Sequence, residues 1–271
     1  MLLNSGKLFR GRILKRPSMV CKTPYVADVL LDDGTLTLAH TASLGCCGLC
    51  DKDPYVYMIK IDNPKNLCKY KIIIANNTER DISQLIGVDP KFAENLVNTS
   101  LQQNTLSWLK NVKEFQREKK YLNSRFDFCG IDENGQEFIL EVKNVPLADY
   151  VDMLDKDKKK LDLSGYEFNN KIAYFPDGYR KKVKDTVSPR ALKHIQELQE
   201  IRKERNIRTI LCFVIQRDDV SSFQPSNIDL IYKNAVTEAY HNDVEIKAIQ
   251  IKWEIDGSAN LINDNVKINI D

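Results

Sequence analysis

Two carboxylates and an amine near the middle of the chain could together hold a metal ion. Asp127 precedes Glu141 by fourteen positions, and Lys143 follows two positions later. Between them, Asp132-Glu-Asn-Gly135 predicts the turn of a β-hairpin, because Asn-Gly tolerates the positive φ angles of tight turns. Strand alternation then puts the three side chains on one face. Neighbouring carboxylates repel unless a cation lies between them, and oxygen ligands suit Mg²⁺ or Mn²⁺. The hairpin therefore predicts a metal site with a lysine beside it.

The composition is that of an ordinary folded protein of 271 residues, with 42% hydrophobic and 29% charged residues. This length predicts one large domain or two modest ones. No apolar run approaches the ~20 residues needed to cross a bilayer. The segment Met1–Lys7 also lacks the apolar core of a secretory signal. We therefore expect an intracellular protein, cytoplasmic or nuclear, that is neither secreted nor embedded in a membrane.

Basic residues gather in two places, although the net charge is only +2. The segment from Met1 to Thr23 holds six basic residues and no acidic one: Lys7, Arg10, Arg12, Lys15, Arg16 and Lys22. Four more lie between Arg180 and Lys184. Such patches serve either solvation or nucleic-acid contact, and the charge pattern leaves both open.

Seven cysteines include the cluster Cys46-Cys47-Gly-Leu-Cys50. A structural zinc ion needs four ligands, usually from two such pairs. Only His40 and Cys68 lie near in sequence, and neither brings a second ligand. We expect reduced, partly buried thiols here rather than a zinc site.

The first third of the chain predicts a small β-barrel. Five short runs rich in β-branched or aromatic residues are separated by turn signals: Phe9–Leu14, Tyr25–Leu31, Thr35–Ala39, Tyr55–Ile61 and Tyr70–Ala75. Five short strands at close spacing favour an OB-like barrel, and we place this domain at residues 1–84.

The remainder, residues 85–271, predicts an α/β domain. Asp89-Pro90 and Ser188-Pro189 are typical helix starts, and the second begins a helix with Leu192, Ile195, Leu198 and Ile201 on one stripe. A buried strand at Thr209–Ile215, a helix at Asn227–His241 and a strand at Val244–Trp253 should follow. We expect the polar stretch Asn144–Phe175 to leave the core, a loop to run through Pro225, and the tail from Gly257 to be peripheral.

The hairpin resembles the metal site of the PD-(D/E)XK nuclease superfamily. Asp127 and Glu141-Val-Lys143 stand where that fold has its acid and its Glu-x-Lys, with Phe126 in place of the proline. The resemblance implies that Asp127, Glu141 and the carbonyl of Val142 hold Mg²⁺ or Mn²⁺. It also implies that Lys143 positions the attacking water or stabilises charge, and that Glu118 is a further catalytic or ligand residue.

Ordered blocks along nearly the whole chain are similar to the sugar fermentation stimulation protein family. They include Ala27-Asp-Val-Leu-Leu-Asp-Asp-Gly34, Asn123-Ser-Arg-Phe-Asp-Phe128, Glu141-Val-Lys-Asn-Val145, Arg190 with Lys193-His194, and Val244-Glu-Ile-Lys-Ala248. This resemblance implies an OB-like domain, a nuclease-like domain and DNA binding with little sequence preference. Three segments depart from the family pattern: Thr41–Leu44, and the longer stretches Asp149–Asn170 and Gly178–Thr186.

The residues expected to meet DNA phosphates are Lys15, Arg16, Arg125, Arg190 and Lys193. His194, which we place on the polar face of its helix, should touch either a phosphate or the mouth of the site. Contacts to phosphates carry affinity but little sequence information.

Two functions remain open. The first is a metal-dependent endonuclease acting on DNA, for which a homodimer would supply two sites for two strands. The second is a non-catalytic DNA-binding regulator that uses the nuclease fold as a docking surface. A third possibility is a scaffold that binds no nucleic acid. For the site itself, the structural alternative is that Glu141 and Lys143 form only a surface salt bridge to Asp127.

Overall fold

The computed structural model describes residues 1–42, 48–51, 54–176, 185–205 and 207–270. Cys46, Cys47 and the basic run Arg180–Lys184 lie outside the described residues. The chain forms two compact units. The first holds residues 1–96, 216–218 and 251–262, and the second holds residues 97–215, 219–250 and 263–271. No helix in the described ranges has the length and apolarity to cross a membrane.

The first unit contains a closed five-stranded barrel. Its strands are β2 (Phe9–Lys15), β3 (Val26–Leu31), β4 (Leu36–Thr41), β5 (Tyr55–Lys60) and β6 (Tyr70–Glu79). Neighbours pair in the order β4-β3-β2-β5-β6, and a parallel β4–β6 pairing closes the ring. Apolar side chains fill the interior, among them Ile13, Val29, Val56 and Met58. The predicted OB-like barrel is confirmed.

Additional strands extend this unit. Strand β7 (Ile82–Gly87) pairs with β6, and β1 (Leu3–Asn4) pairs antiparallel with β16 (Ser258–Asn263). The expectation of a peripheral tail from Gly257 is wrong, because Ala259 in β16 is fully buried. The sequence of β16 is too polar and too short to show a strand pattern by itself.

The second unit is built on a mixed sheet in the order β8-β9-β10-β13-β15. The strands are β8 (Glu114–Tyr121), β9 (Ser124–Ile131), β10 (Glu137–Val145), β13 (Arg208–Ile215) and β15 (Glu245–Trp253). The first three are antiparallel, whereas β10, β13 and β15 are parallel. The hairpin, the buried strand and the last strand lie where the sequence predicts them.

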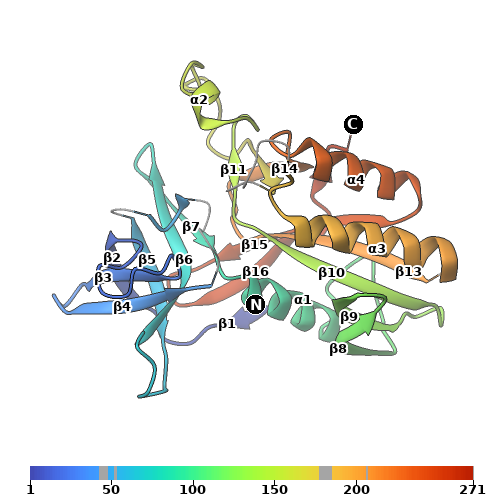
Figure 1. Ribbon diagram of the computed structural model, residues 1–271, viewed down its shortest axis with the longest axis horizontal. Coiled ribbons are helices and arrows are strands. Elements are labelled where there is room, and N and C mark those ends of the chain that lie inside the picture. Colours follow the sequence, from blue (N-terminus) through green and yellow to red (C-terminus); the bar gives the residue numbers. More distant parts are fainter. Residues whose placement is uncertain (43–47, 52–53, 177–184, 206, 271) are drawn as a thin grey trace. The chain divides into compact units, whose positions relative to one another are not determined.

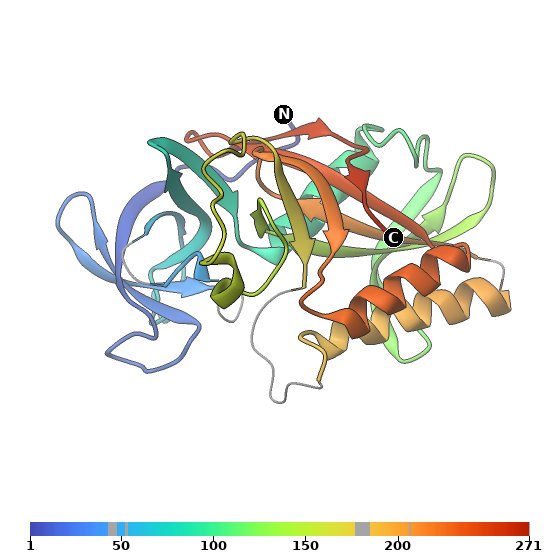
Figure 2. The ribbon, with the colours of Figure 1, turned by 90° about the horizontal axis from the view of Figure 1, so that it is seen from above.

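Two helices pack side by side against this sheet, as Figures 1 and 2 show: α3 (Pro189–Arg205) and α4 (Leu230–His241). Ile195 and Leu198 of α3 share a core with Val236 of α4 and Phe213 of β13. Helix α1 (Pro90–Gln102) begins at the predicted place, where the Asp89 carboxylate accepts the N–H of Lys91 at 3.0 Å. The predicted α/β architecture is confirmed.

A second sheet corrects part of the prediction. It contains β11 (Ala148–Asp149), β12 (Lys171–Phe175), β14 (Val220–Pro225) and β17 (Lys267–Ile268), and the short helix α2 (Asp155–Lys158) precedes β12. We expected Lys171–Phe175 to leave the core and Val220–Pro225 to be a loop, but Ala173 and Phe223 are fully buried. The buried ion pair of Lys171 with Asp219, at 2.7 Å, lets a strand with a charged end enter the core.

An ion pair between parallel strands predicts a pH-dependent stability. Arg208 of β13 binds both carboxylate oxygens of Glu245 on β15, and its guanidinium also donates to the carbonyl of Trp108 at 2.6 Å. Burial raises the pKa of Glu245, but the hydrogen bonds and charge of Arg208 lower it further, so the net pKa lies below its ordinary 4.5. A lowered folded-state pKa stabilises the fold above pH 4.5, and this stabilisation is lost as the pH falls through the folded-state value.

We therefore expect Glu245→Gln to lower the free energy of unfolding at pH 7 by about 1–2 kcal/mol. The difference from wild type should shrink in urea titrations performed below pH 4.5. Glu204→Gln, at an exposed position on α3, is the matched control and should change little. A Glu245→Gln deficit that stays constant down to acid pH would contradict the assignment.

Candidate active site

The β9–β10 hairpin brings Asp127 and Glu141 to the same level of the sheet. The turn forms as predicted: the Asp132 carboxylate accepts the N–H groups of Asn134 and Gln136 at 2.9 Å each, and Gly135 has φ +82°. The regular antiparallel pairing ends at Leu140 opposite Phe128. Two residues further along β10, the Val142 N–H donates to Asp127 Oδ2 at 2.7 Å. The carboxylate of Asp127 thus replaces main-chain pairing where the two strands separate.

Glu141 is the buried centre of the site, with 3% of its surface exposed. Its Oε1 atom contacts both the Lys143 amine and His194 Nδ1, and Lys143 Nζ lies 3.5 Å from His194 Nδ1. Burial raises the pKa of Glu141, but the Lys143 charge and the His194 contact outweigh it, so the pKa lies below its ordinary value. Glu141 is therefore an anion at neutral pH.

The alternative of a surface salt bridge is wrong. Alternation along β10 puts Glu141 and Ile139 on one face, and Ile139 belongs to the core that includes residues of α3. The face that carries the acid and the lysine is therefore covered rather than solvated. Burying an ion pair this deeply costs desolvation free energy unless further hydrogen bonds or charges stabilise it.

His194 joins the site from α3, which corrects its predicted place on a polar helix face. The residue is 4% exposed, and its ring lies 5.7 Å, centroid to centroid, from the ring of Phe126. The sequence contained the signal, because Ala191, His194, Leu198 and Ile201 recur at spacings of three or four, and all are buried. Of the predicted stripe, Ile195, Leu198 and Ile201 are buried, whereas Leu192 is only partly buried.

Glu118 lies on β8 beside the same site. Its neighbours Arg117 and Lys119 pair with Phe128 and Phe126, so Glu118 stands opposite Asp127. Its φ of +59° is unusual for a non-glycine residue. The carboxylate is half-exposed and binds the Arg125 guanidinium at 3.1 Å. The Glu118 carboxylate can therefore join the site only if its ion pair with Arg125 opens.

The oxygen atoms of Glu141, Asp127 and the Val142 carbonyl are of the kind that bind a hard divalent cation. Glu141 Oε2 is buried and has no hydrogen-bond partner, which costs free energy unless something binds there. Asp127 supplies a second carboxylate. The Val142 carbonyl faces the side of β10 where Asp127 lies, since the N–H and C=O of one strand residue point the same way. Yet across the described chain, no three His, Cys, Asp or Glu side chains already form a metal-binding group.

Predicted phosphate-binding residues meet in one cavity. Arg125, Arg190, Lys193 and His194 line a hollow of about 450 Å³ together with Asn123, Ser124 and Pro189. The Lys193 amine donates to the Asn123 carbonyl at 2.9 Å, which ties α3 to the turn before β9. Because His194 also contacts Glu141, this basic cavity adjoins the acidic site.

Lys15 and Arg16, the two residues of the barrel predicted to contact DNA phosphates, differ in their exposure. Lys15 is exposed on β2. Arg16 does not present its guanidinium to solvent: its side chain is 5% exposed and binds the Asp51 carboxylate at 2.8 Å. The sequence could not reveal this pairing, because thirty-five positions, including strands β3 and β4, separate the two residues. A role for Arg16 in direct phosphate contact is therefore withdrawn.

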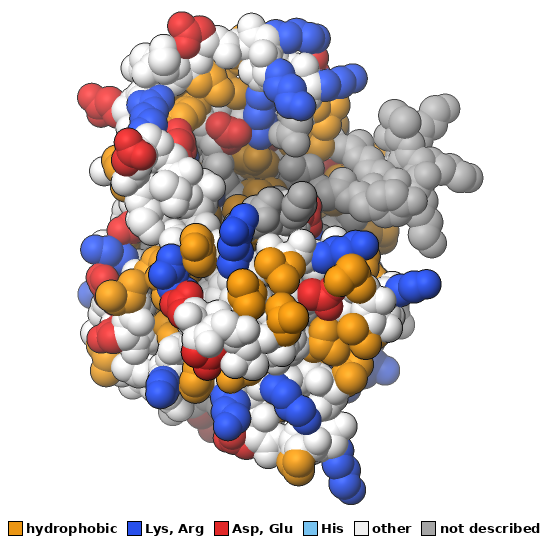
Figure 3. Space-filling view, turned by 90° about the vertical axis from the view of Figure 1, so that its left-hand side faces the viewer, with side chains coloured by type: hydrophobic (Ala, Val, Ile, Leu, Met, Phe, Trp, Pro, Cys, Tyr) orange, Lys and Arg blue, Asp and Glu red, His pale blue; other side chains and the backbone are white. Residues whose placement is uncertain are grey.

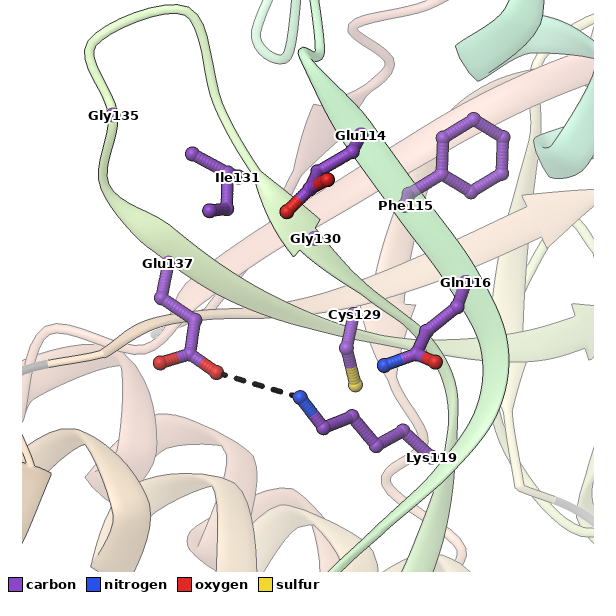
Figure 4. Close-up of a pocket in the computed structure, with 9 residues that line it drawn as sticks. All are labelled: Glu114, Phe115, Gln116, Lys119, Cys129, Gly130, Ile131, Gly135 and Glu137. Atoms are coloured by element: carbon purple, nitrogen blue, oxygen red, sulfur yellow. Dashed lines mark ion pairs between the residues drawn. The ribbon is translucent and has the colours of Figure 1, made fainter.

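A second cavity on the hairpin, of about 520 Å³, offers no reactive nucleophile. Figure 4 shows its lining, in which the Lys119 amine and the Glu137 carboxylate lie 3.9 Å apart. Cys129 lines it, but burial, which outweighs the attraction of Lys119, raises the pKa of its thiol to about 12. Cysteine catalysis at neutral pH is therefore unsupported in this cavity.

Known proteins resemble this chain in sequence and in fold. The family model described as the sugar fermentation stimulation protein RE domain matches residues 91–257. A sugar fermentation stimulation protein homolog from Magnetococcus marinus is 31% identical over 224 residues, which cover 82% of each chain. The chain belongs to the sugar fermentation stimulation protein family. The resemblance proposed from the sequence is confirmed.

Similarity to this family extends over the full length. A sugar fermentation stimulation protein homolog from Alteromonas mediterranea is 28% identical, over 97% of this chain and 98% of its own. A solved structure, the Pyrococcus furiosus SfsA in complex with Ca²⁺, superposes with a TM-score of 0.77 over 99% of both chains at 19% identity. At that identity the likeness shows a shared fold.

Proposed function

We propose that this chain is a metal-dependent endonuclease that hydrolyses DNA phosphodiester bonds with little sequence specificity. The observation that carries the proposal is the buried, ionised Glu141, whose Oε2 has no hydrogen-bond partner. Its strand separates from β9 just beyond the Leu140–Phe128 pair, where Asp127 accepts the Val142 N–H. The proposed domains are an OB-like barrel at residues 1–84 and a PD-(D/E)XK nuclease-like domain at residues 85–271. A homodimer would provide one site for each strand of a duplex.

Asp127, Glu141 and the Val142 carbonyl would hold Mg²⁺ or Mn²⁺. The Pyrococcus furiosus relative was solved with Ca²⁺, which prefers the same oxygen ligands as Mg²⁺. When bound, such an ion acts as a Lewis acid and lowers the pKa of water, which makes water a better nucleophile. Glu118 would assist if its pair with Arg125 opens.

Lys143 supplies a positive charge beside the reacting phosphate. Its amine now rests on Glu141 Oε1, and the flexible side chain can turn toward a phosphate as negative charge develops on the phosphate oxygens. His194 would then remain as the hydrogen-bond partner of Glu141 Oε1. The histidine thus keeps the carboxylate in place while the lysine moves.

Arg125, Arg190 and Lys193 would bind the phosphates that flank the reacting one. The cavity that they line adjoins Glu141 through His194. Backbone contacts of this kind set affinity and register without reading bases.

This arrangement predicts the behaviour of a phosphate-contact variant. The double substitution Arg190→Ala and Lys193→Ala should weaken duplex DNA binding for all sequences alike, because two charge contacts are lost. The slope of log affinity against log salt should fall by about 1 to 2 units. Fluorescence anisotropy over a salt series measures both quantities, with Lys203→Ala, at the far end of α3, as the control. An unchanged salt slope would remove this cavity from the DNA path.

A non-catalytic DNA-binding regulator is the second candidate, and one observation favours it. The Lys143 amine and the His194 ring already contact Glu141 Oε1, and the described side chains form no three-residue metal group. In that case the same fold would bind DNA without cutting it.

A cleavage assay separates the two candidates. Supercoiled plasmid and single-stranded DNA would be incubated with Mg²⁺ or Mn²⁺ and either wild type or Asp127→Asn, since asparagine keeps an acceptor for the Val142 N–H but removes the charge. Cutting by wild type alone supports the nuclease. Equal DNA retention with no cutting by either protein supports the regulator.

A further inference from the structure

Two arginines and two tyrosines form a patch on the outside of the barrel. Arg10 and Arg12 lie on β2, and the register places them opposite Tyr57 and Tyr55 of β5. The residues between them, Gly11 and Val56, are buried, so the four side chains share the outer face. We call these four residues the Arg–Tyr patch. Figure 3 turns the left-hand side of Figure 1 toward the viewer, and that face shows Lys and Arg side chains interspersed with hydrophobic ones.

Three residues of the patch, Arg10, Arg12 and Tyr55, are exposed, and Tyr57 is partly exposed. The Arg10 guanidinium lies over the Tyr55 ring at 4.0 Å from its centroid, a diagonal cation–π contact across the two strands. Tyr55 nevertheless remains 39% exposed. Arg10 also lies 3.7 Å from Asp32, but both side chains are largely exposed, so this pair contributes little and gives way easily.

A cavity of about 380 Å³ opens beside the patch. Tyr55 forms part of its wall, with Pro54 before it and Asn76, Asn77 and Thr78 of β6 across from it. The Asn76 amide oxygen accepts from the Ser83 hydroxyl at 2.7 Å. The Asn77 amide makes no hydrogen bond within the described part of the chain, which leaves a donor and an acceptor at the cavity wall.

The side chains of the Arg–Tyr patch and its cavity are of types that bind bases and phosphates. An exposed aromatic ring offers a stacking partner to a planar group, an arginine offers a contact to phosphate, and a primary amide matches the polar edge of a base. The segment from Met1 to Thr23, which includes β2, is basic without a single acid. A DNA duplex conceals the faces of its bases, whereas a single strand exposes them.

We propose that the Arg–Tyr patch and the adjoining cavity bind single-stranded nucleic acid. One base stacks on Tyr55, Arg10 and Arg12 bind the backbone on either side, and Asn77 hydrogen-bonds the edge of the base. This site lies on the barrel and uses none of the residues proposed for cleavage. It gives the chain a second mode of nucleic-acid contact, by stacking rather than by phosphates alone.

The test measures anisotropy of short fluorescein-labelled oligodeoxythymidylate and oligouridylate with the full-length protein in EDTA, so that no cleavage intervenes. Tyr55→Ala should weaken single-strand binding about 5- to 100-fold, the usual effect of losing one stacked base. Tyr55→Phe keeps the ring and should stay within about twofold of wild type. Binding of a duplex of equal length should be unchanged in both variants. The two oligomers show whether the site prefers DNA or RNA.

Arg10→Gln is the second variant, and thermal melting verifies that each protein is folded. It should weaken single-strand binding and reduce its salt dependence. Equal single-strand affinity of wild type and Tyr55→Ala, or failure of wild type to bind the oligomers at all, would overturn the proposal; the latter would point to a protein ligand. Because the assay contains no metal, its outcome is independent of whether the protein cuts DNA.

Discussion

Glu141→Gln is expected to reduce DNA cleavage more than about a hundred-fold. Loss of a residue that merely supports a metal ligand usually costs about 10- to 100-fold, and loss of the ligand itself should cost more. Glutamine keeps the size and an acceptor oxygen, but it removes the charge that Oε2 would offer to a cation. Initial cleavage rates on supercoiled plasmid, measured at saturating Mg²⁺, provide the comparison.

Glu137→Gln is the matched control, because this carboxylate lies on the same strand but is half-exposed and pairs with Lys119 at 3.9 Å. It should cut at the wild-type rate. Melting curves must show that Glu141→Gln is folded at the assay temperature, since Lys143 and His194 lose their anionic partner. Wild-type cleavage by folded Glu141→Gln would exclude Glu141 from catalysis.

His194→Ala is expected to weaken Mn²⁺ binding about 10- to 100-fold, the usual effect of removing a group that orients a metal ligand. The imidazole holds Glu141 Oε1 from within the core, which leaves the buried Oε2 without a hydrogen-bond partner and available to a cation. Without the ring, the carboxylate can turn and pair fully with Lys143. Isothermal titration with MnCl₂ measures the change directly, without reference to cleavage.

His194→Gln separates orientation from simple packing. Glutamine can restore a hydrogen bond to Glu141, so its metal affinity should lie closer to wild type than that of the alanine variant. If the two variants lose stability equally but only alanine loses metal affinity, His194 acts by positioning Glu141. Wild-type Mn²⁺ affinity in His194→Ala would show that the contact is only structural.

The barrel and the hairpin could be predicted because their signals are local. The run Tyr55–Ile61 became β5 (Tyr55–Lys60) because alternating Val56 and Met58 fill the barrel. The Asn-Gly turn fixed the hairpin through contacts within a few residues. Such features depend on neighbours in the sequence, which are visible without coordinates.

The second sheet could not be predicted, because its strands are short and held by distant partners. Lys171 is buried at a strand end only because Asp219, forty-eight positions later, neutralises it. The contact between Glu141 and His194 likewise joins residues fifty-three positions apart. Helical spacing could have shown that His194 faces inward, but it could not have shown which side chain it meets.

The most direct test of the proposed metal site is calorimetric titration of the full-length protein and of its Asp127→Asn variant with MnCl₂. The account predicts saturable uptake by wild type at the carboxylates of Asp127 and Glu141, and uptake at least about tenfold weaker in the variant. If wild type takes up no Mn²⁺, or if both proteins bind it equally, these two carboxylates do not form a metal site.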